Sequence, residues 1–161
     1  MLKVLFVCMG NICRSPAAQG IFKKFVDDAR LENMISVDSA GTIGYHAGEM
    51  PDARMRQYAS KRGYNLVSLA RQFNPKQDFD KFDYIITMDN HNYSDILSLD
   101  YNSQFNKKIF KMADFIFDKN VCEVPDPYYS DANGFEFVID ILEDGTKNLL
   151  TKIKYDLERI T

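Results

Sequence analysis

The stretch VCMGNICRSP, residues 7–16, joins an apolar run to a segment in which apolar residues recur at helical spacing. Residues 2–7 form the near-continuous apolar run expected of a central strand that is buried on both faces. Gly10 and Asn11 are residue types that tolerate a positive φ, so the loop between can curl and point backbone N–H groups inward. A loop of this kind, followed by a helix N-terminus, predicts a site for a tetrahedral oxyanion.

The same loop carries a nucleophile and a cation. Cys8 ends the apolar run, and Arg14 follows after five residues. Arg14 can make bidentate hydrogen bonds to two phosphate oxygens. The cation and the helix N-terminus favour the thiolate form of Cys8, to which the Ser15 hydroxyl is placed to donate a further hydrogen bond. We also expect Ser15 to cap the helix and Pro16 to take its first position.

Apolar runs and helical patterns alternate along the chain, which predicts an α/β fold. We expect a single small doubly wound domain over residues 1–161, with a four-stranded parallel sheet and helices on both faces. The expected strands are 2–7, 35–39, 83–88 and 109–112, and the clearest helical patterns are 18–29, 52–62 and 135–160. Gly145 interrupts the last pattern at about 1 kcal/mol relative to Ala, so one kinked helix or two helices are both compatible with it. Ligands of such sheets bind at the carboxyl ends of the strands, where Cys8 lies.

Composition narrows the classes of function. The chain has 20 basic and 23 acidic residues, and this lack of basic excess argues against a nucleic-acid partner. No apolar run approaches the ~20 residues of a membrane span, and the N-terminus lacks a secretory signal, so we expect a cytoplasmic protein. Three cysteines and two distant histidines match neither a disulfide framework nor a zinc site, so no metal is expected.

These motifs resemble the signature of the low-molecular-weight protein tyrosine phosphatases, which carry V-C-x-G-N-x-C-R-S-P near the N-terminus. Further stretches resemble family landmarks in the expected order, at 38–42, 70–72, 87–89 and 126–128. The resemblance implies hydrolysis of phosphotyrosine on proteins, and of small aryl phosphates, through a phosphocysteine on Cys8 and without a cofactor. It also implies inhibition by inorganic phosphate or other oxyanions. The phosphate-binding loop that it implies consists of Met9, Gly10, Asn11, Ile12, Cys13 and Ser15.

Asp126 is the candidate general acid. The neighbouring Pro125 and Pro127 restrain its backbone, and the D-P-Y sequence matches the family. A phenolate is a poor leaving group near pH 7, and a general acid contributes typically 10²–10⁴-fold. After the leaving group departs, the same carboxylate would activate the water that hydrolyses the phosphocysteine.

The resemblance assigns aromatic walls to the substrate pocket. Tyr128 and Tyr129 would stand beside the acid, and Tyr45 would form the opposite wall. A buried tyrosine with a satisfied hydroxyl is the alternative for Tyr129.

Other residues would support the loop. Ser39 matches a position that hydrogen-bonds to it, and Asp89 matches a carboxylate that orients Arg14, although Asp89 could instead cap a helix. Ser68 stands where some family members carry histidine, which removes one supporting hydrogen bond. Cys13 would form a reversible disulfide that protects Cys8 from irreversible oxidation, or would only pack against the helix.

Three other functions use the same elements. An arsenate reductase needs two more cysteines after the third strand, but residues 82–100 contain none and Cys122 stands alone. A protein arginine phosphatase typically has threonine at the position of Ile12, whose bulk favours a flat aromatic ring. A non-catalytic phosphate-binding module would need neither the nucleophile Cys8 nor the acid Asp126.

Overall fold

The computed structural model describes all residues 1–161 and contains a four-stranded, all-parallel sheet in the order β2-β1-β3-β4. This confirms the predicted α/β class. The strands are β1 (Leu2–Cys8), β2 (Ile35–Gly41), β3 (Tyr84–Thr87) and β4 (Ile109–Lys111). The α-helices are α1 (Arg14–Asp28), α2 (Ala53–Lys61), α3 (Pro75–Lys81), α4 (Asn90–Leu99) and α5 (Ala132–Ile160).

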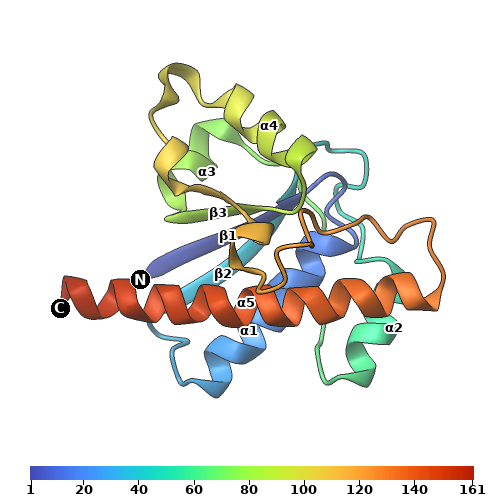
Figure 1. The fold of residues 1–161 in the computed structure, drawn as a ribbon. Coiled ribbons are helices and arrows are strands. Elements are labelled where there is room, and N and C mark those ends of the chain that lie inside the picture. The colour runs from blue at the N-terminus through green and yellow to red at the C-terminus, as the bar shows by residue number, and fades with distance from the viewer.

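The helices lie on both faces of the sheet (Figure 1). Helices α1, α2 and α5 contact one another on one face, and α3 and α4 lie on the other. Strand β1 is central, paired with β2 along its whole length and with β3 over Val4–Val7, and its side chains there alternate between two buried layers. Val4 and Phe6 belong to the larger cluster under α1 and α5, whereas Leu5 and Val7 belong to the smaller cluster under α3 and α4.

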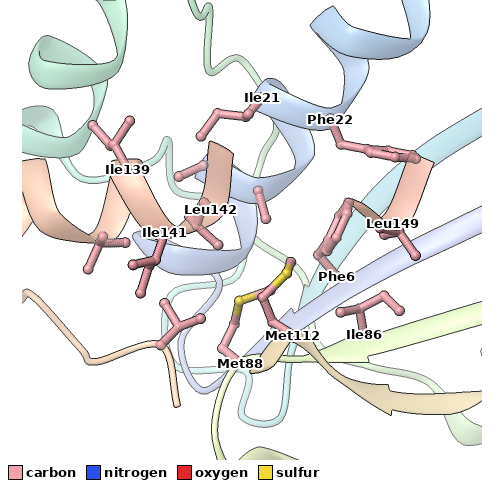
Figure 2. Packing of buried hydrophobic residues seen from close by; sticks show 14 of the residues in the cluster. Phe6, Ile21, Phe22, Ile86, Met88, Met112, Ile139, Ile141, Leu142 and Leu149 are labelled. Atoms are coloured by element: carbon pink, nitrogen blue, oxygen red, sulfur yellow. The ribbon is translucent and has the colours of Figure 1, made fainter. Parts of the chain in front are cut away.

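The larger hydrophobic cluster packs α1 and α5 against one face of the sheet. Figure 2 shows Phe6 from β1, Phe22 from α1 and Leu149 from α5 meeting there. The rings of Phe6 and Phe22 pack edge to face, with centroids 5.6 Å apart. Burial of this side of β1 holds the carboxyl end of the strand, and therefore Cys8, at a fixed height beneath the N-terminus of α1.

Helix α5 is continuous through Gly145, which settles the alternative left open by the sequence. A Cβ at Gly145 would lie 2.7 Å from the sulfur of Met112 and 3.3 Å from Cγ1 of Ile116. The glycine therefore allows the helix to approach the segment after β4 closely, and it does not break the helix.

The sequence prediction gives no range for two helices, α3 and α4, although it offers Asp89 as the cap of a helix after the third strand. Both are short and begin with a side-chain cap: Asn74 accepts a hydrogen bond from the backbone of Lys76, and Asp89 accepts one from the backbone of Asn92. Such caps are readable in a sequence, but neither helix has a long apolar stripe to accompany them. No helix of the structure is both long enough and apolar enough to cross a membrane.

Candidate active site

The phosphate loop, residues 8–15, connects β1 to α1 as expected. Asn11 has a φ of 57°, the left-handed conformation that its residue type tolerates. Helix α1 starts earlier than predicted, so Cys13 occupies the N-cap and makes no side-chain capping bond. The prediction that Ser15 caps the helix, with Pro16 first, is therefore wrong. Ser15 lies inside the first turn, and its hydroxyl turns toward the loop instead.

The Asn11 side chain organises the loop. Its Oδ1 accepts a hydrogen bond from the backbone N–H of Arg71 at 3.0 Å, which fixes the orientation of the amide. Its Nδ2 then donates to Ser15 Oγ at 2.7 Å and to Ser39 Oγ at 2.9 Å. The Ser39 hydroxyl in turn donates to Gln19 Oε1 at 2.6 Å.

This order of donors determines where the Ser15 proton points. Ser15 Oγ lies 3.0 Å from Cys8 Sγ, and both groups are buried. Because Asn11 already donates to Ser15 Oγ, the Ser15 hydroxyl is free to donate to the sulfur. The arrangement therefore places a hydrogen-bond donor at the Cys8 sulfur, as the sequence predicted.

Arg14 is buried beside the same sulfur and is held by two distant segments. Its Nη1 donates to Asp89 Oδ2 at 2.6 Å and to the backbone carbonyl of Val124 at 3.1 Å. Burial lowers the pKa of Arg14, but the charge of Cys8 and the hydrogen bond and charge of Asp89 outweigh it, so the net shift is upward. The guanidinium therefore remains charged and oriented.

Asp89 fills both roles that the sequence offered as alternatives. One carboxylate oxygen pairs with Arg14, and the other accepts the backbone N–H of Asn92 in a capping box at the start of α4. A carboxylate has two oxygens with separate lone pairs, so the two roles do not compete.

A pocket of about 340 Å³ opens above the phosphate loop. Asp126 lines it, and its Oδ2 lies 3.7 Å from Nη2 of Arg14. Its side chain is half exposed, and its other oxygen accepts the backbone N–H of Tyr128 at 3.1 Å. The predicted nucleophile, cation and acid thus share one cavity. The pocket is lined by Cys8, Met9, Gly10, Ile12, Cys13, Arg14, Ile43, Tyr45, His46, Asp126, Tyr128 and Tyr129.

All three predicted wall tyrosines line this pocket. Tyr129 is 96% exposed, so the alternative of a buried, satisfied tyrosine is wrong for it. Tyr45 is also exposed and packs edge to face on His46, with ring centroids 4.8 Å apart. The lining of the pocket therefore includes aromatic side chains from two segments that are far apart in the sequence.

Cys13 is buried at the pocket base and is a free thiol, as are Cys8 and Cys122. Burial, followed by the negative charges of Asp52 and Cys8, raises the pKa of Cys13. Cys13 is therefore protonated at neutral pH, whereas the sequence predicts a thiolate at Cys8. Its redox role stays a prediction.

Several residues of the site were missed by sequence reasoning. Ile43 and His46 line the pocket next to Tyr45, and His46 Nδ1 lies 2.5 Å from Glu49 Oε2. Gln19 and Arg71 complete the hydrogen-bond chain around Asn11, whereas Ser68 takes no part in it. Arg71 falls within the family landmark at 70–72, but the sequence assigns it no role. Ile43 and His46 carry a local signal because they flank a predicted wall residue.

Comparison with known proteins agrees with this geometry. A model of the family described as low molecular weight phosphotyrosine protein phosphatase matches residues 3–159. The low molecular weight protein-tyrosine-phosphatase YfkJ of Bacillus subtilis is 39% identical over 155 residues, which is 96% of this chain and 97% of that protein.

Solved structures give the same result. A protein tyrosine phosphatase from Entamoeba histolytica, crystallised with Hepes in its active site, is 47% identical with a TM-score of 0.93, covering 97% of this chain and 99% of that one. The Drosophila arginine phosphatase is 33% identical with a TM-score of 0.89, covering 95% and 98%. The chain belongs to the low molecular weight phosphotyrosine protein phosphatase family.

Proposed function

We propose that the protein hydrolyses phosphotyrosine in proteins, and small aryl phosphates, through a phosphocysteine on Cys8. The observation that carries the proposal is the convergence of Cys8, Arg14 and Asp126 on one pocket that three tyrosines also line. Phosphotyrosine-containing proteins are therefore the proposed partners.

The first step is attack of the Cys8 thiolate on phosphorus. The S–P bond forms while the P–O bond to the phenol breaks, and Asp126 gives its proton to the departing oxygen. Arg14 and the inward N–H groups of the loop bind the three equatorial oxygens of the transferred phosphoryl group. Ser15 donates to the sulfur and stabilises it as a thiolate before attack and as a leaving group afterwards.

The second step is hydrolysis of the phosphocysteine. Asp126, now a carboxylate, accepts a proton from a water molecule whose oxygen attacks phosphorus. The S–P bond breaks, inorganic phosphate leaves, and Cys8 returns to its thiolate form. Phosphate and other oxyanions would bind the same loop as competitive inhibitors.

The pocket walls support an aryl substrate. Ile12 and the tyrosines present flat and apolar surface to a ring, and the phosphate must reach Cys8 at the base. The likeness to an arginine phosphatase makes phosphoarginine the second substrate to test.

The test compares wild type with Cys8→Ser. The wild type should release p-nitrophenol from p-nitrophenyl phosphate in EDTA and should dephosphorylate a phosphotyrosine peptide faster than the matched phosphoarginine peptide. Cys8→Ser should lose turnover by about 10⁶-fold, the scale seen when an enzyme nucleophile is removed, while still binding vanadate. Turnover by Cys8→Ser would refute the nucleophile assignment, and faster cleavage of phosphoarginine would refute the aryl substrate.

We also propose that residues 1–161 fold as one domain and that the protein works in the cytoplasm. One sheet with both faces covered supports the first proposal, and three free thiols, including the proposed nucleophile, support the second. A single unfolding transition and cell fractionation test them.

A further inference from the structure

Arg54 connects the two loops of the active site through Asp52 and Tyr128, without lining the pocket itself. It lies in the first turn of α2, and its guanidinium makes two hydrogen bonds to the Asp52 carboxylate, at 3.2 and 3.1 Å. Its Nη2 also donates to the backbone carbonyl of Tyr128 at 2.9 Å. The same guanidinium lies over the rings of Tyr128 and Phe135, 5.5 and 4.8 Å from their centroids.

The Asp52 end of this bridge is fixed to the phosphate loop. The backbone N–H of Asp52 donates to the carbonyl of Ile12 at 2.7 Å. The Asp52 carboxylate caps α2 by accepting the backbone N–H groups of Arg54 and Met55. Burial raises the pKa of Asp52, but the hydrogen bonds from Arg54 and the backbone lower it below its ordinary value, so the pair is fully charged.

The Tyr128 end holds the acid loop, residues 125–130. The hydrogen bond from Arg54 is the only one that joins residues 125–130 to another part of the chain. Tyr128 in turn restrains the Asp126 side chain, because its own N–H donates to Asp126 Oδ1. The ring of Phe135, buried at the start of α5, gives the guanidinium a rigid surface that does not belong to the loop.

We propose that Arg54 is a positioning residue that sets Asp126 over the phosphate loop. The inference rests on the proposed role of Asp126 as general acid. An error of about 1 Å in the placement of a catalytic group can cost about 10²-fold in rate. Loss of Arg54 should therefore slow the step in which Asp126 protonates the leaving group, while the anion site stays intact.

The experiment measures kcat/KM for phenyl phosphate, whose leaving group needs a proton, and for 2,4-dinitrophenyl phosphate, whose leaving group does not. Arg54→Gln should lose about tenfold with phenyl phosphate and less than about twofold with the dinitrophenyl ester. Arg54→Lys, which keeps a charged donor, should recover part of the loss. Arg56→Gln is the matched control, because Arg56 is also exposed on α2 but its side chain bonds only to the carbonyl of Pro51.

A second comparison separates positioning from a general structural role. In an Asp126→Ala background, Arg54→Gln should have no further effect on kcat/KM, since it acts through the missing acid. The basic limb of the pH profile for phenyl phosphate should also move in Arg54→Gln and stay unchanged in Arg56→Gln. Thermal unfolding confirms that each variant is folded.

The outcomes test separately whether Asp126 is the general acid and whether Arg54 positions it. If Asp126→Ala slows both esters equally, the assignment of the acid fails. If Asp126→Ala shows the expected dependence on leaving group but Arg54→Gln slows both esters equally, or adds its full effect to Asp126→Ala, the positioning role of Arg54 is overturned. An effect of Arg56→Gln as large as that of Arg54→Gln would overturn it as well.

Discussion

The phosphate loop and the acid loop face each other across one pocket, but the fold holds them very differently. The phosphate loop is mostly buried, with only Met9 exposed, and the side chains of Asn11 and Ser15 are tied to one another, to Cys8 and to segments as distant as Arg71. The acid loop is exposed apart from Pro127, and one hydrogen bond from Arg54 joins it to another part of the chain. The phosphate loop, which holds a charge that is present throughout the reaction, is thus rigid. Asp126, which acts on the departing product, lies on a loop with few restraints.

Asp126→Ala should have the largest effect on activity, and it should show most clearly that the acid loop contributes to catalysis and hardly to stability. We expect kcat/KM for phenyl phosphate to fall by about 10²–10⁴-fold, with little change for 2,4-dinitrophenyl phosphate. The free energy of unfolding should hardly change, because the side chain is half exposed. Urea unfolding alongside the kinetics checks both parts, and a large loss of stability would contradict the comparison.

Asn11→Ala should produce the opposite pattern. The variant leaves the Arg71 N–H without its partner and places alanine in a left-handed conformation, so we expect a loss of roughly 3 kcal/mol in the free energy of unfolding. Activity should fall by about 10²-fold on both esters, because the anion site itself is disturbed. A selective effect on the poorer leaving group would show that the two loops are not independent.

Ser15→Ala tests the donor to the sulfur. A hydrogen bond to a charged group is worth about 1.5–3 kcal/mol, so inactivation by iodoacetate at pH 6 should slow by about 10–100-fold. Mass spectrometry of the labelled peptide should locate the modification on Cys8. Ser98→Ala, on the exposed surface of α4, is the control, and equal slowing in both variants would refute the contact.

Tyr129→Ala should have a smaller effect, confined to binding. An exposed ring that stacks on a substrate contributes about 0.5–1.5 kcal/mol, so KM for a phosphotyrosine peptide should rise by about 2–10-fold at constant kcat. A fall in kcat instead would mean that Tyr129 helps to place the acid.

The smallest effect concerns Asp52, where the two loops are joined. Its pKa is lowered in the folded protein, so its charge stabilises the fold above the unfolded value of about 3.9, and this contribution is lost as pH falls through the folded pKa. Asp52→Asn keeps a capping side chain but removes the charge. We expect it to cost about 1 kcal/mol or less at pH 7, and the difference from wild type should shrink in urea unfolding as pH falls below the unfolded value of about 3.9. A difference that does not change as pH is lowered through this range would show that the charge is not its source.

The sequence predicts the local parts of this design and misses the distant ones. Cys8 and Arg14 are recognisable because a strand, a loop and a helix follow one another within 15 residues. The hydrogen bond from the backbone of Arg71 to Asn11 leaves no trace in the residue type at position 71, since every residue except proline has that N–H. The role of Gly145 likewise depends on Met112, which approaches it only in the folded chain.

Because of the contacts of Arg14, the active site can be completed only late in the synthesis and folding of the chain. Its partners are Asp89, 75 residues away, and the carbonyl of Val124, 110 residues away. During synthesis the reactive thiol emerges first, but the Asp89 carboxylate that orients its cation emerges only after more than half of the polypeptide, and the Val124 carbonyl only after more than three quarters. A partly synthesised chain therefore contains the thiol long before it can be active. Recovery of activity during refolding should report completion of the whole sheet.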